Sequence, residues 1–191
     1  MHFIPLEVSS QLERLAPEIP FPAYAFVPRK FPHPTRDPEG HSYGRPEPKP
    51  IPLTADNWSQ SADYLHGIDL FNHGYFWEAH EAWEGLWHAC GRQGDVAGFL
   101  KALIKLAAAG VKAREENPNG VQRAAQRAAR LFETIRLAQP DSSATFLGFS
   151  FDSLVELAFR LPHETAHFST AALGSKLPTF ASRMTLAPSS N

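Results

Sequence analysis

The sequence predicts an all-α protein, a compact bundle of four to five helices with a proline-rich N-terminal arm wrapped around it. Three observations predict this class. Apolar residues recur at helical spacing through much of the region 54–160. Twelve of the 17 prolines fall within the first 52 residues, where helices and central strands can hardly persist. The 191 residues, 43% of them hydrophobic, suffice for one substantial core, whereas a second full domain is not expected.

We therefore divide the chain into three regions: the arm over residues 1–53, a helical domain over 54–160, and a tail over 161–191 that covers the domain or is partly mobile. Aromatic residues such as Phe21 and Tyr24 alternate with the prolines of the arm, which gives it apolar surface to bury. We expect the arm to lie against the helices.

Apolar periodicity and turn residues locate the individual helices. Thr54 to Asp56 offers an N-cap for the first helix, and His73-Gly74 turns the chain into the second. The third helix has the wide apolar face of a central helix, and its Gly110 permits close helix approach. Asn117 to Gly120 forms a turn before the fourth. The predicted helices span about residues 54–72, 75–89, 95–115, 121–138 and 152–160.

The second predicted helix carries a motif in which ligand-type side chains lie among three tryptophans. His80, Glu84 and His88 form one stripe on this helix, with Glu81 beside it. The run from His80 to Glu84 resembles the zincin helix motif with its second histidine replaced by glutamate. An imidazole and a carboxylate can hold one metal ion while Glu81 orients or deprotonates its water. His80 and His88 are separated by about 12 Å of helix rise, so further ligands must come from elsewhere. In the alternative interpretation, Glu84 simply pairs with His80 or His88 on a polar helix face.

The same residues carry a family resemblance. The run from Leu70 to Trp87, the segment from Leu103 to Ala109 and the turn from Asn117 to Gly120 are similar to a small bacterial helical family called domain of unknown function 309. The most specific part is an aromatic-Glu-Ala-His-Glu run that ends in Glu-x-x-Trp, within a resemblance over residues 60–140. Members are commonly labelled predicted metal-dependent hydrolases, so the resemblance implies a helical fold and that activity. Lys105 departs from the glutamine expected in many relatives.

The arm offers two further histidines and an aspartate, His33, Asp37 and His41, in a segment rich in prolines and turns. Proline fixes φ at a low entropic cost, so this segment can hold the three side chains toward a common point. We expect the arm histidines to complete a site begun by the helix. In the alternative interpretation, both histidines bond turns or backbone carbonyls while the arm covers the core.

The sequence thus leads to two hypotheses from different classes. The first is a metal-dependent hydrolase that acts on an unidentified small molecule. The second is a non-catalytic binding or scaffold protein, with a protein partner, whose His and Glu side chains form a buried hydrogen-bond network between arm and bundle. For the hydrolase, the predicted metal ligands for zinc, manganese or iron are His33, His41, His80 and Glu84, the general base is Glu81, and the substrate pocket includes Trp77, Asp37 and His88.

Charge and composition limit the classes of partner that we expect the protein to bind. The net charge of −2 and the lack of a glycine-rich phosphate loop favour neither nucleic acid nor an anionic membrane as a partner. Basic side chains do occur on the third and fourth helices, but we interpret them as solvated faces because Glu133 and the Glu115-Glu116 pair offset their field. These basic residues are Lys101, Lys105, Lys112, Arg123, Arg127 and Arg130. The lone cysteine and the absence of a signal-like start indicate a cytoplasmic protein, and a homodimer is one expected assembly.

Overall fold

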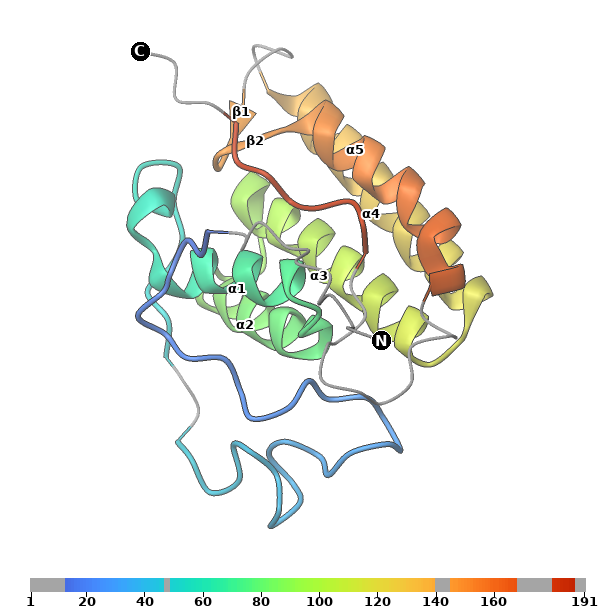
Figure 1. Ribbon diagram of the computed structural model, residues 1–191. Coiled ribbons are helices and arrows are strands. Elements are labelled where there is room, and N and C mark those ends of the chain that lie inside the picture. Colours follow the sequence, from blue (N-terminus) through green and yellow to red (C-terminus); the bar gives the residue numbers. More distant parts are fainter. Residues whose placement is uncertain (1–12, 47–48, 140–144, 168–179, 188–191) are drawn as a thin grey trace, which may run out of the picture.

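The computed structural model describes residues 13–46, 49–139, 145–167 and 180–187. In this part of the chain the protein is mostly helical, with five α-helices packed together (Figure 1), which confirms the predicted class. The α-helices are α1 Ala62–Asn72, α2 Phe76–Ala89, α3 Gly94–Arg114, α4 Pro118–Ala138 and α5 Phe151–Arg160. The shorter elements are 3-10 helices at Trp58–Gln60 and Leu161–His167 and the strands β1 Thr145–Phe146 and β2 Phe149–Ser150.

Helix α3 is the central helix of the bundle, and it packs against α2 on one side and α4 on the other. Its Phe99, Leu103 and Leu106 are fully buried, as the wide apolar face of the sequence predicts. Close approach to α2 depends on Gly110, because a Cβ at this position would lie 2.3 Å from the Phe76 ring. The bundle therefore holds α2, which carries the ligand-type motif, firmly against its centre.

Helix α1 begins later than predicted. Its N-cap is Ser61, whose hydroxyl accepts the Tyr64 N–H at 3.4 Å. Thr54 and Asn57 instead bond each other's backbone, with the Thr54 N–H donating to Asn57 Oδ1 at 2.8 Å and the Asn57 N–H donating to Thr54 Oγ1 at 3.2 Å. Such local bonds compete with helix formation. The N-cap predicted over Thr54 to Asp56 is therefore wrong.

Helix α4 begins earlier than predicted, at Pro118. Asn117 is its N-cap, and its Oδ1 accepts the Gly120 N–H at 2.8 Å. The residues expected to form a separate turn are therefore the cap and first turn of the helix, where proline is well tolerated because its missing N–H has no intrahelical partner.

A short hairpin that the sequence analysis did not predict joins α4 to α5. Strands β1 and β2 are antiparallel, and Phe146 lies opposite Phe149. Between them, Leu147 and Gly148 have φ of 47° and 82°, as two-residue hairpin turns require. The Tyr64 hydroxyl donates to the Leu147 carbonyl at 2.8 Å, which ties this hairpin to α1.

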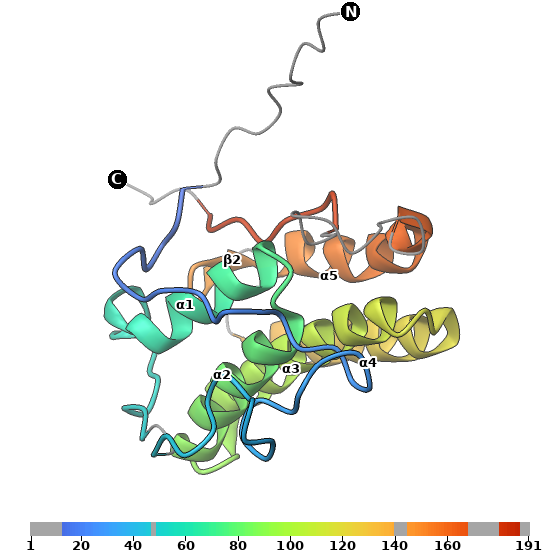
Figure 2. The ribbon, with the colours of Figure 1, turned by 60° about the horizontal axis from the view of Figure 1, so that its bottom comes forward.

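The arm lies along α1 and α2 (Figure 2) and is held by two buried carboxylates. Asp69 of α1 accepts the Leu15 and Ala16 N–H groups, each at 2.9 Å. Glu78 of α2 accepts the Phe26 N–H at 2.8 Å. These bonds satisfy arm backbone donors that the apolar contact with the helices removes from water.

The described end of the chain, residues 180–187, runs as an extended segment between α1 and α5 (Figure 1). Asn72 of α1 accepts the Met184 N–H and donates to the Met184 carbonyl, both at 2.9 Å. Residues 168–179 and 188–191 of the predicted tail lie outside the described residues. The division of the chain into arm, helical domain and tail stays a prediction. None of the described helices is long and apolar enough to cross a membrane.

Candidate metal site

Three side chains of α2 form the candidate metal site. His80, Glu81 and Glu84 each offer one ligand atom, and these atoms lie within 4.8 Å of one another. The distance from His80 Nδ1 is 3.5 Å to Glu81 Oε1 and 4.0 Å to Glu84 Oε2. Glu84 is four positions from His80 and three from Glu81, spacings at which helix side chains meet, so α2 alone brings this group together.

The hydrogen bonding of His80 fits a bound cation. Its Nδ1 is buried and forms no hydrogen bond among the described residues, although it lies within ion-pair distance of both carboxylates. Bonds of about 2.1 Å to one ion place its ligands roughly 3–3.5 Å apart. The 3.5 Å separation from Glu81 already matches, and the 4.0 Å separation from Glu84 requires a small rotation. His80 and Glu84 could therefore hold a divalent ion, with Glu81 close enough to contact a water bound to it.

The group is also accessible from solvent. The His80 side chain is 26% exposed, and those of Glu81 and Glu84 are 46% and 41% exposed. One imidazole and two carboxylates are borderline to hard ligands that suit zinc, manganese or iron. A water molecule or a substrate can reach this face of α2, which is a requirement for a catalytic site but not for a structural one.

The arm histidine His41 contacts a different carboxylate of the same helix. Its Nε2 lies 3.2 Å from Glu78 Oε1, and its Nδ1 lies 2.9 Å from the Ser42 hydroxyl. The His41 and Glu78 side chains are only 8% and 5% exposed. Both ring nitrogens thus have protein partners in this structure. The role of His41 as a metal ligand stays a prediction.

Glu78 is the residue that the sequence analysis missed. Burial raises the pKa of its carboxyl, while hydrogen bonds from Phe26 and His41 lower it. Its Oε1 accepts the Phe26 N–H, and its Oε2 is buried without a hydrogen-bond partner among the described residues. One sequence signal was available: Glu78 shares a helix face with Ala82 and Gly85, and small residues indicate a face that other backbone covers.

His33 lies beside Trp77 at the start of α2. The ring centroids of His33 and Trp77 are 5.6 Å apart, and Phe26 lies 5.2 Å from each ring in edge-on or tilted contacts. Trp77 precedes His80 by three residues and Glu81 by four, so it projects from the same side of α2. The arm therefore places an aromatic cluster about one helical turn from the candidate metal group.

Asp37 and His88 have other contacts. Asp37 Oδ1 accepts the Glu39 N–H at 3.0 Å and stabilises a turn of the arm. His88 is exposed near the end of α2, and its ring lies 5.1 Å from that of Trp87. No described interaction joins either residue to His80, Glu81 or Glu84. Their assignment to a substrate pocket stays a prediction.

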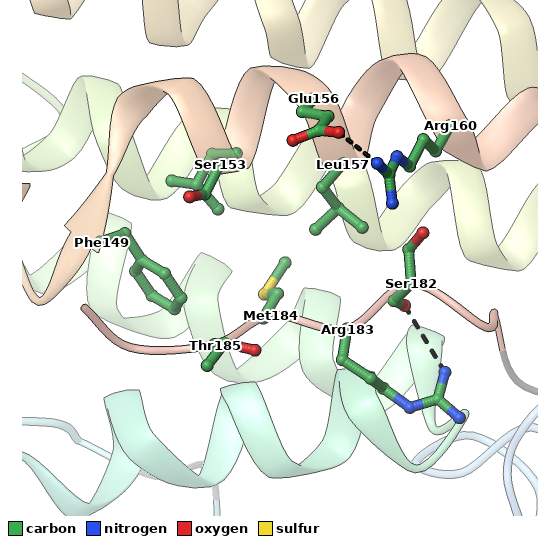
Figure 3. Close-up of a pocket in the computed structure, with 10 residues that line it drawn as sticks. Phe149, Ser153, Glu156, Leu157, Arg160, Ser182, Arg183, Met184 and Thr185 are labelled. Atoms are coloured by element: carbon green, nitrogen blue, oxygen red, sulfur yellow. Dashed lines mark hydrogen bonds and ion pairs between the residues drawn. The ribbon is translucent and has the colours of Figure 1, made fainter. Parts of the chain in front are cut away.

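A separate cavity of about 230 Å³ lies between α5 and the extended segment 180–187 (Figure 3). Arg160, Ser182 and Arg183 lie toward one end of it, and Phe149 lies toward the other (Figure 3). Within this end, Arg160 pairs with Glu156 of the same helix. None of the predicted site residues lines this cavity, so the candidate metal group is a surface site on α2 and not part of this cavity.

The fold and the α2 group together define a class: a helical protein with a candidate metal site on a helix beside the central one. Comparison with known families identifies the family to which part of the chain belongs. Residues 64–124 match the family described as domain of unknown function (DUF309), so this part of the chain is a DUF309 domain. The match lies within the 60–140 resemblance predicted from sequence and includes all of α2. No curated protein and no solved structure matches the chain.

Proposed function

We propose that the protein is a metal-dependent hydrolase whose divalent ion is held on α2. The observation that carries the proposal is the position of His80 Nδ1, which is buried, has no hydrogen-bond partner among the described residues, and lies 3.5 and 4.0 Å from two carboxylates. When bound, a divalent ion lowers the pKa of a coordinated water and so makes a nucleophile available at neutral pH.

The two carboxylates have separate roles in this proposal. Glu84 is four residues from His80 and forms with it the chelating pair expected on one helix face. Glu81 is the more exposed carboxylate of the two, so it can accept the proton of an attacking water as the general base. His33 remains a candidate ligand from the arm, whereas His41 would have to release its bond to Glu78 or Ser42 to coordinate an ion.

The arm supplies the walls of the substrate site. His33, Phe26 and Trp77 form an aromatic surface one turn before the metal group, and aromatic faces suit the apolar part of a small molecule. The His41 to Glu78 bond fixes the arm against α2 and so keeps that surface in place. A small-molecule substrate and a cytoplasmic location belong to the same proposal.

One observation favours a second candidate, a non-catalytic scaffold in which histidine and glutamate join the arm to the bundle. Glu78, His41 and the Phe26 N–H already form such a buried network. This network uses neither His80 nor Glu84, however, and therefore does not account for the grouping of His80 with two carboxylates on α2. The two candidates differ in whether metal binds.

The metal content of tag-free protein distinguishes the hydrolase from the scaffold. Elemental analysis after dialysis against zinc, manganese or iron is expected to find one ion per chain in the parent protein. His80→Ala and Glu84→Gln should lose it. His88→Ala, on the same helix but without contact to the group, is the matched control and should retain it. Absence of metal from the parent under all three conditions would refute the hydrolase and leave the scaffold.

Catalysis is tested separately with Glu81→Gln in a screen of hydrolase substrates such as esters, phosphoesters and amides. Loss of the general base should lower kcat by about 10²–10⁴-fold while metal content stays at one per chain. Equal activity of this variant and the parent, on any substrate the parent hydrolyses, would remove Glu81 from the proposed role.

A further inference from the structure

The outer faces of α3 and α4 carry a positive charge that the ion pairs of the protein do not neutralise. The sequence interpretation depended on three acidic residues to offset it. In the structure these acids are engaged elsewhere. Glu115 pairs with Lys112 at 2.6 Å, Glu116 pairs with Lys30 of the arm at 3.6 Å, and Glu133 pairs with Arg136 at 2.7 Å.

Five cations are left over on these two helices. None of them has an ion-pair partner among the described residues, and no aspartate or glutamate occurs within residues 96–114 or 117–132. All are exposed except one, which is half-buried. We call this set the basic face: Lys101, Lys105, Arg123, Arg127 and Arg130.

The two helices that carry these residues lie side by side. A Cβ at Gly98 of α3 would lie 3.5 Å from Ile135 of α4, and a Cβ at Gly120 of α4 would lie 2.9 Å from Lys112 of α3. The helices are therefore antiparallel neighbours (Figure 2). Counting inward from these two contacts places Lys105 level with Arg127 at the middle of the helix pair.

The acidic residues of α5 are themselves in ion pairs. On α5, Asp152 lies 3.7 Å from Arg136 and Glu156 pairs with Arg160. At the start of α3, Asp95 accepts a hydrogen bond from the neutral amide of Gln139 at 3.0 Å, so it keeps its charge, but it lies six residues before Lys101. The five cations of the basic face thus have no ion pair among the described residues, although the chain as a whole carries a net charge of −2.

The chemistry of this face favours a polyanion. Arginine presents a planar fork that binds phosphate in a bidentate manner. Arg123 and Arg130 are about 10 Å apart along α4, so the stripe can contact more than one phosphate of a nucleic-acid strand. A membrane fits less well, because amphipathic helices bind it through an apolar face, and the one exposed large apolar side chain on the described α3 and α4 is Leu137.

We propose that the basic face binds the phosphodiester backbone of a nucleic acid without reading its sequence. This goes beyond the proposed hydrolase and is independent of it, since none of the five cations belongs to the α2 group. It also revises the expectation that nucleic acid is not a partner, which was drawn from the net charge, the lack of a phosphate loop and the offset by nearby glutamates. The reason is that the three glutamates expected to offset the five cations pair with other basic residues instead.

The test is the salt dependence of binding to a short labelled DNA duplex of random sequence, followed by fluorescence anisotropy. Five phosphate contacts predict a slope of log K against log[salt] of about −4.5, and removing three should make it shallower by about 2.7. The variant is Arg123→Gln, Arg127→Gln and Arg130→Gln together. The matched control is Arg29→Gln, Arg36→Gln and Arg45→Gln together, which removes the same charge from exposed positions of the arm.

A second, independent variant, Lys101→Gln with Lys105→Gln, should make the slope shallower by about 1.8, so the proposal is tested even where one variant fails to fold. An unchanged slope in the arm control with shallower slopes in both face variants supports the proposal. Equal changes in the face and arm variants would overturn it, because binding would then follow net charge alone. No binding by the parent at about 50 mM salt, or binding to phosphatidylserine vesicles but not to DNA, would also overturn it.

Discussion

The bond between Glu78 and the arm gives the sharpest stability prediction. Replacing Glu78 with alanine removes the acceptor of the buried Phe26 N–H and the partner of His41. A buried donor left without a partner costs about 1–3 kcal/mol, and a bond to a charged group contributes about 1.5–3 kcal/mol. Removing a desolvated carboxylate offsets part of this loss. We expect Glu78→Ala to lower the free energy of unfolding by about 3 kcal/mol.

Urea unfolding followed by circular dichroism, with chelator present to exclude bound metal, measures this change. Glu78→Gln retains an oxygen that can accept the Phe26 N–H, so it should lose about 1 kcal/mol or less. Glu81→Ala, at an exposed position three residues along the same helix, is the control and should change stability by no more than about 0.5 kcal/mol. Equal stabilities for Glu78→Ala and Glu81→Ala would refute the view that Glu78 anchors the arm.

Three further predictions concern the same fold. Burial raises the pKa of Glu78 in the folded protein, so the folded state holds that proton more tightly than the unfolded state. The free energy of unfolding of the parent, measured relative to that of Glu78→Gln, should therefore fall as pH rises from about 4. If the free energies of unfolding of the two proteins changed in parallel with pH, this prediction would be contradicted. Asn72→Ala removes both bonds to the Met184 backbone and should lower the free energy of unfolding by about 2–3 kcal/mol; a loss below about 0.5 kcal/mol would be inconsistent with burial of these groups. Gly110→Val would push Phe76 out of place, so we expect it to lower the midpoint of thermal unfolding by several degrees. Gly91→Ala is the control: a Cβ there meets no neighbouring atom, so any loss of stability should come only from the strain of its positive φ.

Much of the helical architecture was accessible from the sequence, because helices depend on local spacing. The central position of α3 follows from its wide apolar face, and close contact at Gly110 follows from the missing side chain. The ends of helices were less accessible. Ser61 and Thr54 are both good N-cap residues, and only the bonds between Thr54 and Asn57 decide that the helix starts after Ser61.

By itself the sequence determined that His80, Glu81 and Glu84 lie together on α2, since they converge through the geometry of one helix. It could not determine where the arm attaches. His41 meets Glu78, 37 positions along the chain, and Glu116 pairs with Lys30 of the arm. These partners depend on how an extended segment lies across two helices, which no local periodicity encodes. The tertiary structure alone therefore decided which charges are paired and which remain exposed, because pairing depends on distance in space and not on separation in sequence.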